Sequence, residues 1–145
     1  MQIAKEYVDA GKIRYALLDF PLAMHPKAFD AAKAVRCAGD QGKFWEMHER
    51  LFANQQALEP WTGHAEAIGL KVSDFEACMK SDKHAEAIRA DQKEGQKGGF
   101  TGTPSFLFAV TDPKDPKKVK GLSAMVGARP IEQFKIEIEK ALAGN

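Results

Sequence analysis

Residues 101–106 of the chain are Thr101-Gly102-Thr103-Pro104-Ser105-Phe106, and they separate two stretches with different hydrophobic periods. Before them, from about residue 26 to residue 97, apolar residues recur three and four positions apart, which predicts a block of helices. After them, residues 105–111 are rich in Phe, Leu and Val, which favour strands. The six residues therefore predict a loop that leads from a helical block into a β-strand.

Downstream of this loop the pattern predicts a hairpin and a last helix. Residues 112–116 contain two prolines and two aspartates and form a turn, after which residues 118–126 can return as the paired strand. Gly127 and Pro130 then precede a helix that carries its apolar residues on one face. Those residues are Ile131, Phe134, Ile138 and Leu142.

Upstream, the first 25 residues predict a helix end and a strand. Residues 1–10 have apolar side chains spaced for one helix face, and Gly11 is a plausible stop. The apolar run at residues 13–20 is best explained as a buried strand, which Pro21 ends.

Residues 26–98 divide into short helices. Small residues form a stripe on the first one, and aromatic residues mark the second after Gly42. Ser73 and Glu76 have the spacing of a capping box, and Asp82 can cap the longer helix that follows. Together with the flanking strands, this predicts an α/β fold with an all-helical insertion.

Composition excludes several classes of function. The 145 residues hold 21 basic and 20 acidic side chains, for a net charge of +1, so neither nucleic acid nor an anionic membrane is an expected partner. No apolar run approaches the roughly 20 residues that span a bilayer, and the first residues do not resemble a signal peptide. No cofactor is expected.

Cysteine and histidine are the candidate reactive side chains. Cys37 and Cys78 form no Cys-x-x-Cys, and they could be buried free thiols, a redox pair or a structural disulfide. The histidines show no metal-ligand spacing, so no metal site is predicted. They are His25, His48, His64 and His84.

Four segments, in this order, resemble the DsbA family of thiol–disulfide oxidoreductases, which have a thioredoxin fold interrupted by a helical domain. They are Arg14–Leu22, Cys37–Trp45, Gly102–Phe106 and Gly127–Pro130. The resemblance covers nearly the whole chain. It implies a thioredoxin-like domain at residues 1–25 and 99–145, and a helical insertion domain at residues 26–98.

The resemblance also implies what the 145 residues do not contain. The family's first strand and the start of its active-site helix, with Cys-x-x-Cys, are expected to precede Met1. No residue therefore takes the role of catalytic cysteine, and the polypeptide is expected to be inactive or very weak in dithiol oxidation. Some family members have a similar structural disulfide, so the resemblance implies that Cys37 and Cys78 form one that joins the first and fourth helices of the insertion.

One site carries over from the family to this chain. An X–Pro bond is usually trans, but the resemblance implies a cis bond at Pro104. Thr103, before it, would pair through its backbone with an extended client polypeptide.

Function and location follow from the same resemblance. It implies thiol–disulfide exchange in unfolded client proteins in the periplasm or another extracytoplasmic space. Two alternatives remain, a non-catalytic peptide-binding or chaperone-like module and a glutathione-dependent isomerase or transferase. Because the missing strand would leave its neighbours unpaired, we expect a homodimer.

Overall fold

The computed structural model describes residues 2–143, apart from the side chains of Pro116 and Lys117. Met1, Gly144 and Asn145, which belong to the predicted thioredoxin-like domain, lie outside the described residues. The chain divides into two units, Met1–Leu17 with Phe100–Asn145, and Leu18–Gly99. The first boundary thus follows Leu17, whereas the sequence predicted it after residue 25.

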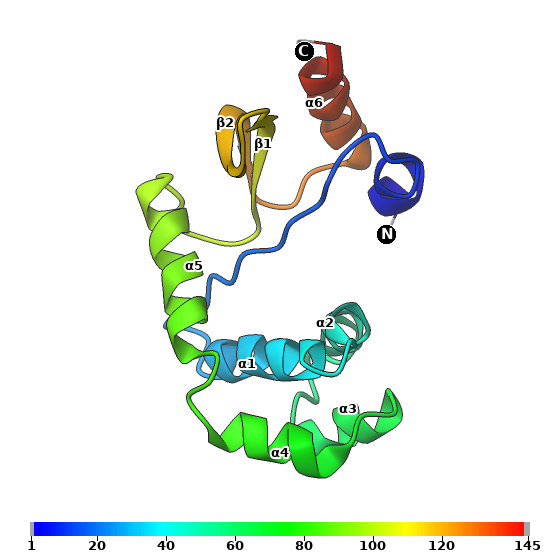
Figure 1. Ribbon diagram of the computed structural model, residues 1–145, viewed down its shortest axis with the longest axis vertical. Coiled ribbons are helices and arrows are strands. Elements are labelled where there is room, and N and C mark those ends of the chain that lie inside the picture. Colours follow the sequence, from blue (N-terminus) through cyan, green and yellow to red (C-terminus); the bar gives the residue numbers. More distant parts are fainter. Residues whose placement is uncertain (1, 144–145) are drawn as a thin grey trace. The chain divides into compact units, whose positions relative to one another are not determined.

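The unit Leu18–Gly99 is helical, and its elements are labelled in Figure 1. They are α1 (Ala28–Gly39), α2 (Phe44–Ala53), α3 (Trp61–Ala67), α4 (Val72–Lys80) and α5 (Ala85–Lys97). In Figure 1, α1 and α4 run alongside each other, and the two helices are in contact.

Small residues on α1 allow this close packing. Ala34 and Ala38 are completely buried, and they lie in one core cluster with Met47 of α2 and Phe75 of α4. Because the alanine side chains are small, neighbouring helices can approach α1 closely, and the large side chains of α2 and α4 pack against its alanine face. The core of this unit is therefore centred on the α1 stripe that the sequence predicts.

The other unit contains a β-hairpin and the last helix. Its elements are η1, a π-helical segment (Ala4–Val8), β1 (Ser105–Asp112), β2 (Asp115–Val126) and α6 (Ile131–Ala143). The two strands are antiparallel, with Phe106 opposite Met125. Phe106 packs edge-to-face on Phe134 of α6, with ring centroids 4.7 Å apart. Alternate β1 side chains therefore point to α6, as the period of two requires.

The combination of a helical unit with a strand-containing unit confirms the α/β class with a helical insertion. None of the described helices combines the length and the apolar character that crossing a bilayer requires.

The predicted strand at residues 13–20 is wrong. The segment forms no ladder, and the sheet of the described residues contains β1 and β2 alone. The far end of the segment is held by side chains instead. Asp19 donates its backbone N–H to Asp91, and Gln92 donates to the carbonyl of Pro21. Apolar content favours a strand, but a strand also needs a paired neighbour.

The predicted capping residues are also wrong. Helix α4 begins at Val72, so Ser73 lies inside it, and its hydroxyl donates to the Asp74 carboxylate rather than accepting from a free backbone N–H. The start is fixed by Gln41, whose side chain bonds both the N–H and the carbonyl of Lys71. Asp82 likewise makes no side-chain cap, since His84 occupies the N-cap position of α5.

Candidate functional site

The loop at Thr103 and Pro104 lies directly before β1. The Thr103–Pro104 peptide bond is cis, and both residues are exposed. Two hydrogen bonds hold the loop on the hairpin. The carbonyl of Pro104 accepts from the backbone N–H of Gly127 at 2.8 Å, and the Ser105 hydroxyl donates to the carbonyl of Gly102 at 2.7 Å. Gly127 follows β2 with φ +81°, a conformation that glycine adopts without steric cost.

A second group of functional side chains lies in the helical unit, where a disulfide joins Cys37 and Cys78. Their Cα atoms are 5.8 Å apart across a sequence separation of 41 residues. Cys37 lies in the last turn of α1 and Cys78 in the last turn of α4. The bond thus fastens the ends of two helices that already pack against each other.

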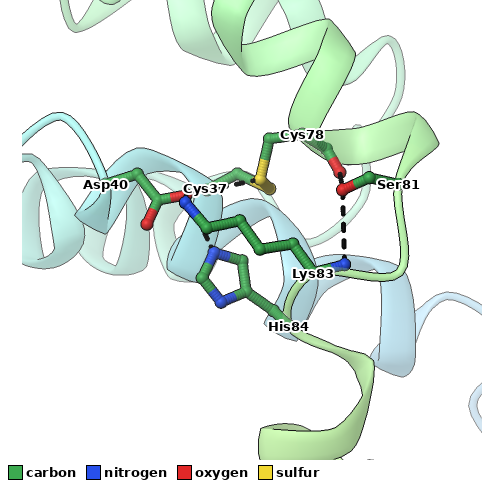
Figure 2. A network of polar contacts seen from close by, with 6 residues as sticks. All are labelled: Cys37, Asp40, Cys78, Ser81, Lys83 and His84. Carbon is green, nitrogen blue, oxygen red and sulfur yellow. Dashed lines mark hydrogen bonds and ion pairs between the residues drawn. A yellow bond between two sulfur atoms is a disulfide. The ribbon is translucent and has the colours of Figure 1, made fainter.

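Asp40 is the centre of the polar contacts around this disulfide, as Figure 2 shows. Its Oδ2 atom lies 2.8 Å from Nζ of Lys83 and 2.9 Å from Nε2 of His84. The same oxygen lies 3.6 Å from Sγ of Cys78. Because that sulfur is part of a disulfide it has no proton to donate, so this last approach is a contact and not a hydrogen bond.

The electrostatics of Asp40 follow from its neighbours. Partial burial disfavours the carboxylate, but hydrogen bonds from Lys83 and His84 outweigh it, so the pKa of Asp40 is lowered. Asp40 is the C-cap of α1, where the helix dipole is unfavourable for a negative charge. The Lys83 ammonium and the His84 imidazole contact Asp40, offset that cost and tie the end of α1 to the segment before α5.

The cysteine cluster borders a surface pocket of about 390 Å³, which Cys37, Asp40, Cys78 and Lys83 help to line. Ligand atoms of Cys37, Cys78 and His84 lie within 4.8 Å of one another, so these three side chains could hold a metal ion once the disulfide is reduced to two thiols. Sequence reasoning missed His84. Its spacing from either cysteine matches no metal motif. The packing of α1 against α4 brings the cysteines together, and the turn from α4 into α5 brings His84 beside them.

The other histidines have structural roles or lie at the surface. His64 is buried, with Nδ1 accepting from Arg50 at 3.1 Å and Nε2 bonded to the carbonyl of Ala57 at 2.9 Å. His48 is buried between Trp45 and Phe52, and its Nδ1 has no partner among the described residues. Burial lowers the pKa of His48. His25 is exposed.

A partly buried ion-pair network lies elsewhere in the helical unit. Arg36 of α1 bonds Asp19 at 2.5 Å and Asp91 of α5 at 2.6 Å. Burial raises the pKa of Asp19, while the hydrogen bond from Arg36 opposes that shift. The network fixes the segment at Asp19 to two helices, and no sequence pattern indicated it.

Comparisons with known proteins show which family this chain resembles. The profile of a family described as thioredoxin matches residues 1–128. The Na⁺/H⁺ antiporter NhaA 1 of Salinispora arenicola is 36% identical over 81% of this chain, and NhaA 3 of Salinispora tropica is 34% identical over 82%. The chain spans 19% of the length of each antiporter.

A further relative carries a different name. A Rickettsia typhi protein named as a protein-disulfide oxidoreductase is 29% identical over 72% of this chain, and the match covers 41% of that protein. Since the family profile matches most of the sequence, this chain belongs to the thioredoxin family, in its DsbA-like form.

Proposed function

We propose that this chain serves thiol–disulfide exchange in client proteins by binding the client as an extended polypeptide at Thr103 and Pro104. The observation that carries the proposal is the exposed loop of these two residues, which leads directly into β1. An extended peptide beside such a loop can pair with its backbone by strand addition. Because backbone hydrogen bonds are independent of side chains, this mode suits unfolded clients of varied sequence.

The chemistry of thiol–disulfide exchange decides whether the 145 residues can catalyse it by themselves. A thiolate must attack, and cysteines at a helix N-terminus are activated by the dipole. Both cysteines of this chain are joined in a disulfide, at the C-terminal turns of α1 and α4. We therefore propose that the 145-residue polypeptide does not oxidise dithiols at a rate typical of the family. The disulfide supports an oxidising, extracytoplasmic compartment.

The binding step is tested with a fluorescent, permanently unfolded polypeptide whose cysteines are blocked. Thr103→Pro removes the backbone N–H of residue 103, and we expect the Kd measured by fluorescence anisotropy to rise at least tenfold. Thr103→Val keeps the backbone N–H and serves as the matched control, with binding close to that of the unchanged chain. Equal binding by all three proteins would contradict the proposal.

Turnover is tested separately by following oxidation of a dithiol peptide. The expected rate is no higher than that of the double variant Cys37→Ala, Cys78→Ala. Turnover that disappears in Cys37→Ala alone would show instead that Cys37 is a working nucleophile.

A second candidate is a chaperone-like module that binds unfolded polypeptides without any redox role. It is favoured by the absence of Cys-x-x-Cys from these residues. Suppression of aggregation of a client that contains no cysteine would support it. Antiport is not proposed, because the similarity covers only 19% of the antiporters.

A further inference from the structure

We propose that the Cys37–Cys78 disulfide conceals a zinc site, which reduction opens and which Cys37, Cys78, His84 and Asp40 form together. The observation is the cluster in Figure 2, where side chains from the ends of α1 and α4 and the start of α5 converge. These four residues supply two sulfurs, one imidazole nitrogen and one carboxylate oxygen. Zinc is commonly held by four ligands of these types.

The ligand atoms lie near the positions that a tetrahedral ion requires, and small side-chain movements complete the fit. With usual zinc–ligand bond lengths, sulfur and oxygen ligands lie about 3.6 Å apart, and nitrogen and oxygen ligands about 3.4 Å apart. Asp40 Oδ2 lies 3.6 Å from Cys78 Sγ and 2.9 Å from His84 Nε2. The two sulfurs must move apart to about 3.8 Å once their bond is broken, a distance that rotation of the cysteine side chains can supply.

Reduction supplies the two sulfur ligands. A dithiol attacks Sγ of Cys78, which is less buried than Cys37, and forms a mixed disulfide while Cys37 leaves as a thiolate. The second thiol of the reductant then attacks the mixed disulfide, Cys78 leaves as a thiolate, and the reductant becomes a disulfide. The two protons that the reductant loses pass to the cysteine thiolates, which gives two thiols. Two electrons pass to the cysteine pair. Binding of Zn²⁺ to the resulting dithiol releases two protons, one from each thiol.

The surroundings allow an ion to enter and keep the site selective. The pocket of about 390 Å³ reaches both cysteines. Lys83 is the cation that now pairs with Asp40, but more than half of its side chain is exposed, so it can turn into solvent when zinc replaces it. Two thiolates and an imidazole favour zinc over the oxygen-seeking ions magnesium and calcium.

The site is tested on the full chain, oxidised or reduced with a phosphine, which gains oxygen from water and does not compete for zinc as a thiol would. Zinc affinity is measured by competition with a chromogenic chelator, and geometry by the spectrum of the Co²⁺ form. We expect one zinc per reduced chain, at least 100-fold weaker binding to the oxidised chain, and the absorption of tetrahedral cobalt with sulfur-to-cobalt charge transfer.

Variants separate this site from non-specific thiol binding. Cys37→Ser with Cys78→Ser should abolish tight binding, and His84→Ala and Asp40→Asn should each weaken it at least tenfold. His25→Ala changes an exposed histidine outside the cluster and should have no effect. Lys83→Met removes the competing cation and should leave affinity unchanged or higher.

Two results would overturn the proposal. One is a reduced chain that binds zinc no more tightly than the double serine variant. The other is tight binding that is insensitive to both His84→Ala and Asp40→Asn, which would indicate two thiols acting alone. Reduction of the disulfide can partly unfold the helical unit, so circular dichroism of the reduced chain is recorded with and without zinc. Zinc bound at this site restores helicity, whereas zinc bound to an unfolded chain does not.

Discussion

At the scale of single residues, Arg36 shows how a charged side chain can hold a chain segment in place. Its guanidinium lies between the carboxylates of Asp19 and Asp91, and less than a quarter of the Arg36 side chain is exposed. Without the cation, two partly buried carboxylates would face each other unpaired. Removing one partner of a buried ion pair costs far more than the pair contributes as a whole.

We therefore predict that Arg36→Leu lowers the free energy of unfolding by about 3 kcal/mol at neutral pH. The loss should shrink toward pH 4. In the Arg36→Leu variant the folded-state pKa of Asp19 rises further above its unfolded value. The variant therefore loses stability as the pH increases from about 4 toward neutral pH. Urea denaturation at several pH values measures both effects. Lys27→Met breaks the exposed Lys27–Glu59 pair and should cost no more than about 1 kcal/mol.

His48 is a second residue whose environment predicts a pH effect. Burial holds the pKa of His48 below its ordinary value, although the charges of Glu49 and Asp19 act in the opposite direction. The unfolded chain therefore binds the proton more readily, and the stability that neutral His48 contributes is lost as pH falls below about 6.5.

We expect His48→Phe to lose less stability than the unchanged chain when the pH falls from roughly 7.5 to roughly 5.5. Thermal denaturation at the two values is the measurement, and the difference between the two proteins isolates the contribution of His48. His25→Gln alters an exposed histidine and provides the control. Identical pH dependence in the His48→Phe and unchanged proteins would contradict this explanation.

At the scale of elements, α5 contains a glycine whose role is steric. A Cβ atom at Gly95 would lie 2.8 Å from Cδ2 and Cε2 of Phe20, closer than real contacts allow. Alanine is normally the better helix former by about 1 kcal/mol. Here the overlap with the Phe20 ring outweighs that gain, because inserting a methyl group into a packed contact costs about 1–3 kcal/mol.

The prediction is that Gly95→Ala destabilises the chain by about 1 kcal/mol, and that adding Phe20→Leu restores part of the loss. Gln96→Ala changes the exposed neighbour in the same helix and should be close to neutral. Denaturant titration of the unchanged chain, Gly95→Ala, Phe20→Leu and the double variant gives the coupling energy. Stabilisation by Gly95→Ala alone would show that the ring moves aside freely.

The elements also show which features the sequence could predict. Helices and the β1–β2 hairpin follow from local periodicity and turn residues, and the structure has them close to the expected bounds. The start of α4 and the fate of residues 13–20 depend on partners distant in sequence, such as Gln41 for Lys71 and Asp91 for Asp19. The cluster of Asp40, His84 and the two cysteines is missing from the sequence pattern for the same reason.

At the scale of the whole molecule, the β-hairpin leaves strand edges for which the described residues provide no further pairing. Two-stranded sheets are marginal by themselves, and unpaired edges invite another strand. Leu107 and Val126 lie on the face of the hairpin opposite Phe106, and about half of each is exposed. We propose that two copies of the chain associate through this hairpin as a symmetric dimer.

Light scattering at micromolar concentration should give twice the monomer mass of 16.0 kDa. Leu107→Lys places a charge on the exposed face of β1, and we expect it to weaken association at least tenfold because burying an unpaired ammonium is costly. Ile136→Lys makes the same change at an equally exposed apolar position of α6, so that variant should remain dimeric. A stable monomer that unfolds cooperatively would reject the dimer, and equal weakening by both variants would place the interface elsewhere.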